Sequence, residues 1–408
     1  MREEVVVPKS YPTNLLNKDW SKRPCYFEKN GEKFLNEVHD MEVRDDDVWL
    51  ITLPKCGTTW MQELTWLVLN DFNFEIAKQE YLELRSPFLE FEIDLYDGEG
   101  SILKNVTKLK SPRLLKTHMP LPLLPPQVWT KKPKVIYVFR NPKDSIVSQY
   151  YHVRRYGGAS DVTPTEFAQN FINDEMSTHQ HFLHVTEFYA LREEPWIYYT
   201  SYERMKSDLR SVIQDVCKFL NKNITEAQMQ QMLHHLSFEE MKNNTRTNHI
   251  WEAEQVRRIY NKKTEDISFV RKGKVGGYKD DLTPEVIDKI DIWINDELKP
   301  HNVTLNDLLL QNNEEFLLTI FTCSTLMMMT TTTTGRVKRS YSDQSVHGYM
   351  TERTCWWNEV CKEEFQSLFR CKCPQFSYCR SPGRYYNAYC SMTDTGYIWT
   401  QPTWDWGP

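Results

Sequence analysis

Short apolar runs alternate with helical patterns between residues 47 and 299, and this alternation limits the possible folds more than any other feature. VWLITL (48–53), KVIYVF (134–139) and WIYYTSY (196–202) are rich in β-branched and aromatic residues and have the length of strands. Each run leads into a segment with helical periodicity, the first of which begins near Thr58. Such repeats predict an α/β fold with a mostly parallel central sheet and helices on both faces.

In sheets of this kind, ligands bind at the carboxyl ends of the strands, so the loops that follow the three runs are the first candidates for a site. The chain has 50 Lys and Arg against 56 Asp and Glu, a net charge of -6. This balance argues against a protein that coats nucleic acid by bulk electrostatics, and no nucleic-acid partner is expected. Any bound anion must therefore be held by a local site.

The loop after the first strand, LPKCGTTW (53–60), has the composition of a phosphate loop. A loop that opens a helix presents unpaired backbone N–H groups and the positive end of the helix dipole, to which a lysine and two hydroxyls are added here. In an ordinary ATP or GTP site the lysine follows the last glycine, whereas Lys55 precedes Gly57. A simple glycine turn with a surface lysine is the alternative.

Two further segments could bind anions. Arg140 ends the second strand and Ser148 follows two turns later, so a guanidinium fork and a hydroxyl could hold one more phosphate. An ion pair between Arg140 and Asp144 is the alternative. RKGKVGGYK (271–279) combines cations with glycines, which brings backbone close to an anion, unless it is only a solvated basic loop.

His118 lies in KTHMP (116–120), between the first two strand runs and just before a Pro-rich loop. A histidine at the end of a strand is a candidate general base because its ordinary pKa lies near working pH. A structural histidine that only donates and accepts hydrogen bonds is the alternative.

Six segments, in this order and spacing, resemble the cytosolic sulfotransferase family over about residues 20–310: TLPKCGTTW, KTHMP, VFRNPKDSIVSQYY, YERMK, SFEEMK and RKGKVGGYK. The resemblance implies transfer of a sulfuryl group from 3′-phosphoadenosine 5′-phosphosulfate (PAPS) to a hydroxyl or amine. The expected acceptor is a small hydrophobic molecule such as a phenol or a steroid-like alcohol. The resemblance implies no metal and a cytoplasmic location for this part of the chain.

The resemblance also assigns roles to individual residues. The 5′-phosphosulfate would lie on Lys55, Cys56, Gly57, Thr58, Thr59 and Trp60. The 3′-phosphate would lie on Arg140 and Ser148, with a second clamp from Arg271, Lys272 and Gly273, and the adenine beside Tyr202 and Phe238. His118 would take the proton of the acceptor, Lys55 would stabilise charge on the leaving oxygen, and Lys116 would assist beside His118. Loops 87–91, 151–156 and the stretch around Trp251 would line the acceptor.

Some positions depart from the family pattern. Cys56 replaces a common serine, Leu236 a common threonine, and Gly277-Tyr278 a common Asp-Trp, which could loosen the loop over the cofactor. The short dimer motif of the family is not matched by Thr283-Pro284 and Asp288, which argues against a homodimer formed by that route.

The strand–helix periodicity stops near Asn312 and the cysteines crowd the end of the chain, which predicts three parts: a sulfotransferase domain at 1–312, a linker at 313–340 and a small module at 341–408. Six of the ten cysteines follow residue 350 and suit a disulfide framework, for which 15 pairings are possible. A zinc site is the alternative, weakened by the tight Cys371-x-Cys373 spacing. The linker has an apolar run and a basic string, RVKR (336–339), typical of secretion and processing. A fused gene model is the leading hypothesis for this junction.

Two other functions compete with the sulfotransferase hypothesis. A P-loop nucleotide kinase would also carry a phosphate loop, but the order of Lys55 and Gly57 and the extra clamps at Arg140 and Arg271 argue against it. A secreted, disulfide-rich binding peptide is the alternative for residues 341–408. Neither a signal-like N-terminus nor an apolar run of 18 residues occurs, so no membrane span is expected.

Overall fold

A computed structural model describes two compact units, residues 1–321 and 322–408. Its described residues are 3–5, 25–27, 31–90, 102–159, 161–173, 181–250, 253–254 and 267–311 in the first unit, and 341–343, 348–351, 353–355, 359–363, 366–373, 377–381, 387–391 and 397–401 in the second. The predictions for the linker, Phe91 and Trp251 lie outside these residues. Among the helices that are described, none has both the length and the hydropathy needed to cross a bilayer.

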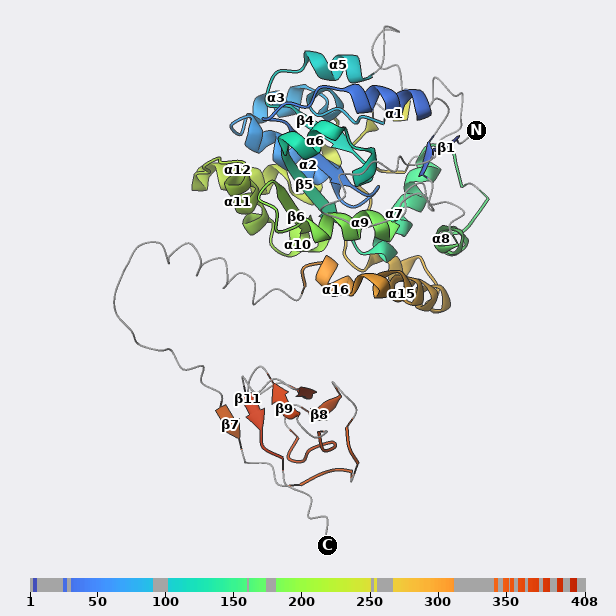
Figure 1. Cartoon of the computed structure of the whole chain (residues 1–408), viewed down its shortest axis with the longest axis vertical. Coiled ribbons are helices and arrows are strands. Elements are labelled where there is room, and N and C mark those ends of the chain that lie inside the picture. Colours follow the sequence, from blue (N-terminus) through green and yellow to red (C-terminus); the bar gives the residue numbers. More distant parts are fainter. Residues whose placement is uncertain are drawn as a thin grey trace, which may run out of the picture. The chain divides into compact units, whose positions relative to one another are not determined.

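A four-stranded, fully parallel sheet forms the centre of the first unit (Figure 1). Its strands are, in spatial order, β4 (Leu114–Thr117), β3 (Val48–Thr52), β5 (Lys134–Phe139) and β6 (Ile197–Ser201). All residues of β3 and β4 are buried, as expected for strands covered on both faces. The α/β prediction and the mostly parallel sheet are confirmed.

The two faces of the sheet belong to two separate hydrophobic cores. Val48 and Leu50 of β3 pack in one core with α2 (Thr58–Leu69) and α11 (Leu209–Phe219). Trp49 and Ile51 pack in the other core, to which α7 (Pro142–Arg155), α9 (His181–Ala190) and α15 (Pro284–Leu298) contribute. The alternation follows from the two-residue period of a strand, and it fixes the carboxyl end of the sheet between two helical layers.

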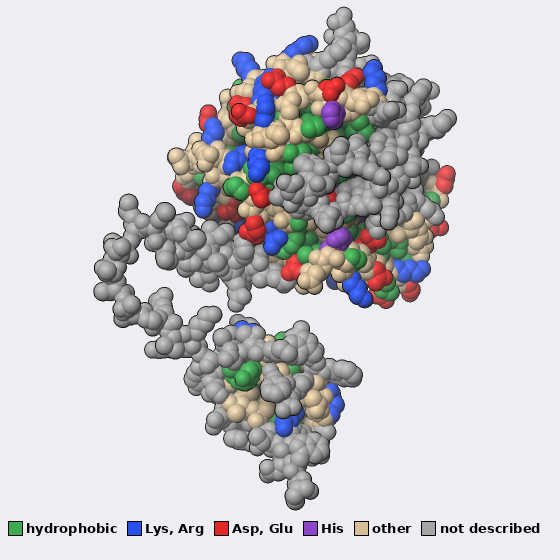
Figure 2. All heavy atoms as spheres, viewed as in Figure 1, with side chains coloured by type: hydrophobic (Ala, Val, Ile, Leu, Met, Phe, Trp, Pro, Cys, Tyr) green, Lys and Arg blue, Asp and Glu red, His purple; other side chains and the backbone are tan. Residues whose placement is uncertain are grey.

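The other elements complete these layers. The remaining helices are α1 (Gly31–Asp40), α3 (Phe74–Gln79), α4 (Leu82–Arg85), α5 (Ile102–Lys108), α6 (Pro126–Lys131), α8 (Pro164–Ile172), α10 (Tyr202–Ser207), α12 (Glu226–His235), α13 (Phe238–Asn243) and α16 (Leu305–Leu308). Short 3₁₀ turns are η2 (Leu121–Leu123), η3 (Gly277–Asp280) and η4 (Lys299–His301), and a small hairpin-like pair consists of β1 (Glu3–Val5) and β2 (Cys25–Phe27). The face shown in Figure 2 carries acidic and basic side chains mixed together.

The structure differs from the sequence prediction after the third strand run. Tyr202 is the first residue of α10 rather than the last of β6, because the Ser201 hydroxyl caps that helix at the Arg204 N–H. The helical segment that follows is two helices, since Asp208 leaves the helical conformation (φ -147°, ψ 75°) and caps α11 at the Ser211 N–H.

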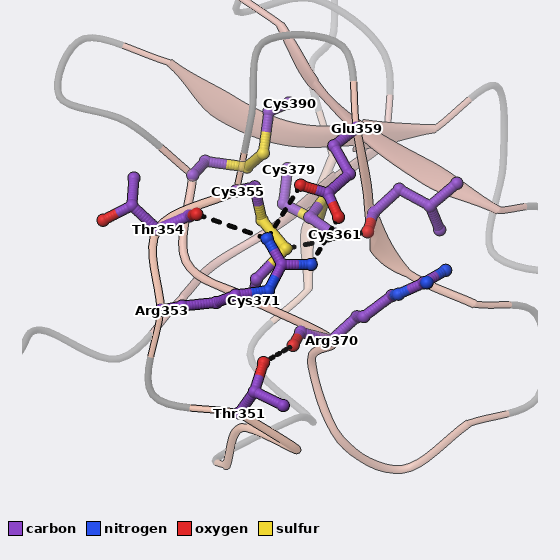
Figure 3. The surroundings of a disulfide bond; sticks show 12 residues. Thr351, Arg353, Thr354, Cys355, Glu359, Cys361, Arg370, Cys371, Cys379 and Cys390 are labelled. Atoms are coloured by element: carbon purple, nitrogen blue, oxygen red, sulfur yellow. Dashed lines mark hydrogen bonds and ion pairs between the residues drawn. A yellow bond between two sulfur atoms is a disulfide. The ribbon is translucent and has the colours of Figure 1, made fainter.

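The second unit is a five-stranded sheet cross-linked by three disulfides. Its strands, in spatial order, are β7 (Tyr341–Asp343), β11 (Tyr397–Trp399), β9 (Tyr378–Ser381), β10 (Ala388–Ser391) and β8 (Val360–Lys362). The disulfides join Cys355 to Cys371, Cys361 to Cys379 and Cys373 to Cys390. Figure 3 shows the surroundings of the first of them. The sulfurs form the core of the unit together with Phe369 and Trp399, as in other domains too small to build an apolar core alone.

An ion pair links two segments beside the first of these disulfides. The Arg353 guanidinium contacts both carboxylate oxygens of Glu359, at 3.0 and 2.5 Å (Figure 3). This fork-to-fork geometry is the favourable one for a partly exposed pair.

Candidate functional site

A cavity of about 460 Å³ lies at the carboxyl end of the parallel sheet. It is lined by side chains from the loop after β3, the end of β4, the end of β5, helix α7 and the basic loop at 267–277. The predicted site residues that line it are Lys55, Gly57, Thr58, Thr59, Trp60, Lys116, His118, Arg140, Ser148, Tyr202, Phe238, Arg271, Lys272 and Gly273. Segments that are far apart in the sequence therefore meet at one site.

Cys56 is the predicted residue whose side chain lies elsewhere. It is 0 % exposed, and burial raises the pKa of its thiol to about 12, so the sulfur is a protonated, inert core group. Any contribution of this position to binding would have to come from its backbone.

The loop from Pro54 to Gly57 turns sharply into α2. Lys55 and Gly57 both have positive φ, 66° and 95°, and a Cβ on Gly57 would lie 2.8 Å from Cδ2 of Tyr202. Glycine is required there by conformation and by space. No side chain caps the N-terminus of α2, so its first N–H groups and dipole face the cavity, as in phosphate-binding loops.

His118 is held in one orientation at the end of β4. Its Nδ1 lies 2.7 Å from the carbonyl oxygen of Thr52, an atom that can only accept. Nδ1 therefore carries the hydrogen of the neutral ring, and Nε2 is the basic nitrogen. The backbone N–H of His118 donates to Glu90 Oε1 at 2.6 Å, and the Phe88 ring packs edge-on against the imidazole.

Glu90 is a buried acid directly behind this histidine. It accepts from the His118 N–H and from the Thr117 hydroxyl, yet burial dominates and raises its pKa to about 7. The hydrogen bonds from the His118 N–H and the Thr117 hydroxyl favour the ionised form of Glu90 and tie it to the His118 backbone.

Lys55 and Lys116 place two ammonium groups at the cavity wall. Lys55 Nζ is 3.7 Å from the centroid of the Phe269 ring, and Lys116 Nζ is 4.3 Å from that of Phe88. Both cations are thus oriented by ring faces, and their charge acts inside a partly desolvated cavity.

Arg140 joins the phosphate loop to the basic loop. Its guanidinium donates to the carbonyl of Lys55 (3.1 Å) and to that of Lys274 (3.3 Å), above the Tyr202 ring. Its Nε is buried with no hydrogen-bond partner among the described residues. A buried N–H without a partner that lines a cavity indicates that a bound ligand supplies the acceptor.

The alternative ion pair between Arg140 and Asp144 is wrong. Asp144 accepts instead from the backbone N–H groups of Gly276 (2.7 Å) and Tyr278 (3.0 Å). Asp144 therefore anchors the end of the basic loop, and Arg140 is left to face the cavity.

The basic loop is anchored by acids on its outer side. Arg271 contacts Asp281 at 3.5 Å and lies over the Tyr151 ring, and Lys272 contacts Asp281 at 2.9 Å. Gly273 has φ 59°, and a Cβ there would lie 2.3 Å from Cδ2 of Phe238. The loop backbone thus approaches the Phe238 ring more closely than any other residue type would allow.

The opposite wall carries Trp60, whose Nε1 donates to the carbonyl of Leu236 at 2.9 Å. Because the acceptor is the backbone carbonyl, this hydrogen bond does not depend on whether position 236 is a leucine or the threonine common in the family. Tyr202 packs edge-on against Trp60.

Several residues of the site were not predicted from the sequence. His249 and Phe269 line the cavity, and Glu83 contacts His249. No motif marks these three, since tertiary packing alone brings them together. His152, which also lines the cavity, lies in the loop 151–156 that was predicted to line the acceptor. Burial, with the charges of Lys55 and His249 adding to it, holds the pKa of His152 well below its ordinary value, so this ring is neutral.

Comparison with known proteins identifies relatives of the first unit. A family model described as the sulfotransferase domain matches residues 45–301. The luciferin sulfotransferase of Photinus pyralis is 35% identical over 280 residues, which cover 65% of this chain and 75% of that protein. Human sulfotransferase 1E1 is 32% identical over 273 residues, 66% of this chain and 90% of that protein.

Two solved structures are also similar to this chain. Retinol dehydratase in complex with retinol and PAP is 28% identical with a TM-score of 0.62, over 69% of this chain and 90% of that chain. The same enzyme with androsterone and PAP gives a TM-score of 0.60 over 69% and 88% of the two chains.

Proposed function

The chain belongs to the sulfotransferase family and is an enzyme that transfers a sulfuryl group to a small acceptor; from this premise, we propose that its donor is PAPS and its general base His118. The observation that carries the proposal is the meeting of His118, the phosphate loop and the cations of the basic loop in one cavity. The related structures that hold PAP at this fold support it.

The residues present fit a nucleotide with phosphates at two ends. Lys55 and the N-terminus of α2 would hold the 5′ end, and Arg140, with its orphan Nε, would hold the 3′-phosphate together with Ser148 and Arg271. At Gly57 and Gly273 the backbone lies directly against the Tyr202 and Phe238 rings, since a Cβ at either position would collide with them. When bound, PAPS would supply the sulfuryl group that is transferred.

The protein residues would divide the remaining work. His118 Nε2 would take the proton of the acceptor hydroxyl, because Nδ1 is already committed to the Thr52 carbonyl. The Lys55 ammonium would stabilise negative charge on the departing phosphate oxygen, and Lys116 would add positive potential beside His118. Phe88, Tyr156 and the neutral His152 line the cavity near this base, which suits a hydrophobic alcohol or phenol as acceptor.

We expect 3′-phosphoadenosine 5′-phosphate to raise the thermal stability of the full chain more than ATP at equal concentration, since a ligand of the folded state stabilises it by about 2.7 kcal/mol at 100 times Kd. Arg140→Ala should weaken binding of this nucleotide by about 1.5–3 kcal/mol, the usual contribution of a charge-assisted hydrogen bond. Thermal unfolding with each nucleotide measures both effects.

Arg192→Ala is the matched control, because Arg192 also lies over a tyrosine ring, 4.0 Å from the centroid of Tyr189, but does not line the cavity. Stabilisation by ATP alone would contradict the proposal and favour a nucleotide kinase.

We expect Gly273→Ala to weaken binding of the same nucleotide, because the new Cβ would force the basic loop away from Phe238. Gly276→Ala is its control: Gly276 also has positive φ, but a Cβ there has no atom within 4 Å. Isothermal titration would compare the two, and equal losses would show that backbone strain rather than the close approach controls binding.

A further inference from the structure

Three side chains form a connected row from the protein interior to the phosphate loop: Glu83, His249 and Thr59. Nδ1 of His249 lies 2.7 Å from Oε1 of Glu83, and Nε2 of the same ring lies 3.0 Å from the Thr59 hydroxyl. The side chains of His249 and Glu83 are 4% and 11% exposed. Of these three residues, only Thr59 lies in one of the motifs found in the sequence.

The backbone of His249 is held in an unusual conformation. Its φ is 55°, in the left-handed region, and its carbonyl accepts from Nη2 of the buried Arg155 at 3.0 Å. The Phe269 ring packs against the imidazole with centroids 4.2 Å apart. Such a conformation is strained and persists where surrounding contacts over-determine it, which is a feature of functional positions.

Several elements of the fold place charged or titratable side chains around His249. Burial alone would raise the pKa of Glu83, but the charge and contact of His249, with Lys116 of β4 further away, bring it below the ordinary value. Helix α7 adds Arg155 at the backbone and the neutral His152, and the phosphate loop adds Lys55. The Glu83 carboxylate is the anion in direct contact with the ring, and it favours the imidazolium.

Two protonation states of His249 orient the Thr59 hydroxyl in opposite ways. Because a carboxylate only accepts, Nδ1 carries a hydrogen in both states. In the neutral ring, Nε2 accepts the Thr59 hydroxyl proton and turns it away from the cavity. In the imidazolium, Nε2–H donates to Thr59 Oγ1, and the hydroxyl proton is turned toward an anion on the phosphate loop.

We propose that Glu83 and His249 form a positioning pair that takes up one proton from solvent on nucleotide binding and thereby makes Thr59 a hydrogen-bond donor to the 5′ anion. This inference rests on the proposed PAPS site. No covalent bond other than N–H is made: the proton enters at Nε2, and the Thr59 hydroxyl rotates without losing its own hydrogen.

Isothermal titration of the full chain with 3′-phosphoadenosine 5′-phosphate, from pH 7 to 9 in two buffers of different ionisation enthalpy, tests this directly. Phosphate groups are already ionised there, their second pKa being near 6. Proton uptake should appear as a buffer-dependent heat. Where binding takes up a proton, the Kd should rise by up to about tenfold per pH unit, as the competent fraction falls.

His249→Asn should abolish the buffer-dependent part of the heat and flatten the Kd between pH 7 and 9, since asparagine tolerates positive φ but does not titrate. Glu83→Gln should move the uptake to lower pH, and Thr59→Ser should retain it. His234→Asn is the matched control: His234 also faces a glutamate, Glu240, at 4.0 Å, but on the surface.

The outcomes separate this inference from the proposed function. Nucleotide binding without proton uptake, or an uptake that persists in His249→Asn, would overturn the positioning pair while leaving the PAPS site intact. Absence of binding at every pH would overturn the proposed function and the pair with it. A merely structural His249 would change stability and Kd, but not the number of protons taken up.

Discussion

His118→Ala should lower kcat by about 10²–10⁴-fold while leaving nucleotide binding nearly unchanged. The Nδ1 contact with the Thr52 carbonyl fixes the side chain, and in the proposed mechanism Nε2 takes the proton of the acceptor. The Thr58 hydroxyl contacts the Thr52 hydroxyl at 2.6 Å and keeps that part of the phosphate loop in place without the imidazole. Replacing His118 should therefore slow proton transfer and leave nucleotide affinity unchanged.

The measurement is formation of PAP from PAPS with 2-naphthol as the phenolic probe, beside isothermal titration with 3′-phosphoadenosine 5′-phosphate. His39→Ala is the control, since His39 is exposed and its nearest partner is Asp40. A His118→Ala enzyme with a kcat near that of the unaltered protein would rule out His118 as the base. A large loss of nucleotide affinity would instead give it a binding role.

Local patterns in the sequence were sufficient to predict the strands and the loops that carry the site. The run 134–139 is β5 with the same ends, and the helix expected from Thr58 begins there. Fully buried parallel strands consist of short apolar runs, and a phosphate loop must connect one of them to a helix, so both features are visible over a few residues. The sulfotransferase family follows from the order of such segments and is confirmed.

The partners within the site could not be predicted, because they depend on contacts between distant segments. Asp144 binds the backbone of the basic loop 132 and 134 residues away, and sequence alone suggested a local pair with Arg140. Thr59 and His249 are separated by 190 residues. The disulfides of the second unit likewise join cysteines 16 to 18 positions apart, and Cys379 and Cys390, which lie opposite each other in the sheet, are bonded to other partners.

A buried ion pair at the opposite end of the same strands holds the site in register. Arg113 donates from Nε and Nη2 to both oxygens of Asp47, at 2.7 and 2.6 Å, and both side chains are 0% exposed. The carbonyl of Arg113 also accepts from the Val48 N–H. This pairing sets β3 beside β4, where Ile51 lies opposite Thr117, and so brings Thr52 to His118.

Arg113→Ala should therefore lower the free energy of unfolding of the first unit by about 3–5 kcal/mol, because it leaves the Asp47 carboxylate buried without its cation. Urea unfolding of the full chain measures the loss, and Lys222→Ala, which breaks the exposed pair with Asp71, should cost about 0–1 kcal/mol. The double change Asp47→Leu with Arg113→Met should recover much of the stability, since no uncompensated charge remains. A loss in Arg113→Ala as small as that in Lys222→Ala would mean that the β3–β4 register is set by apolar packing alone, and that the position of His118 does not depend on this pair.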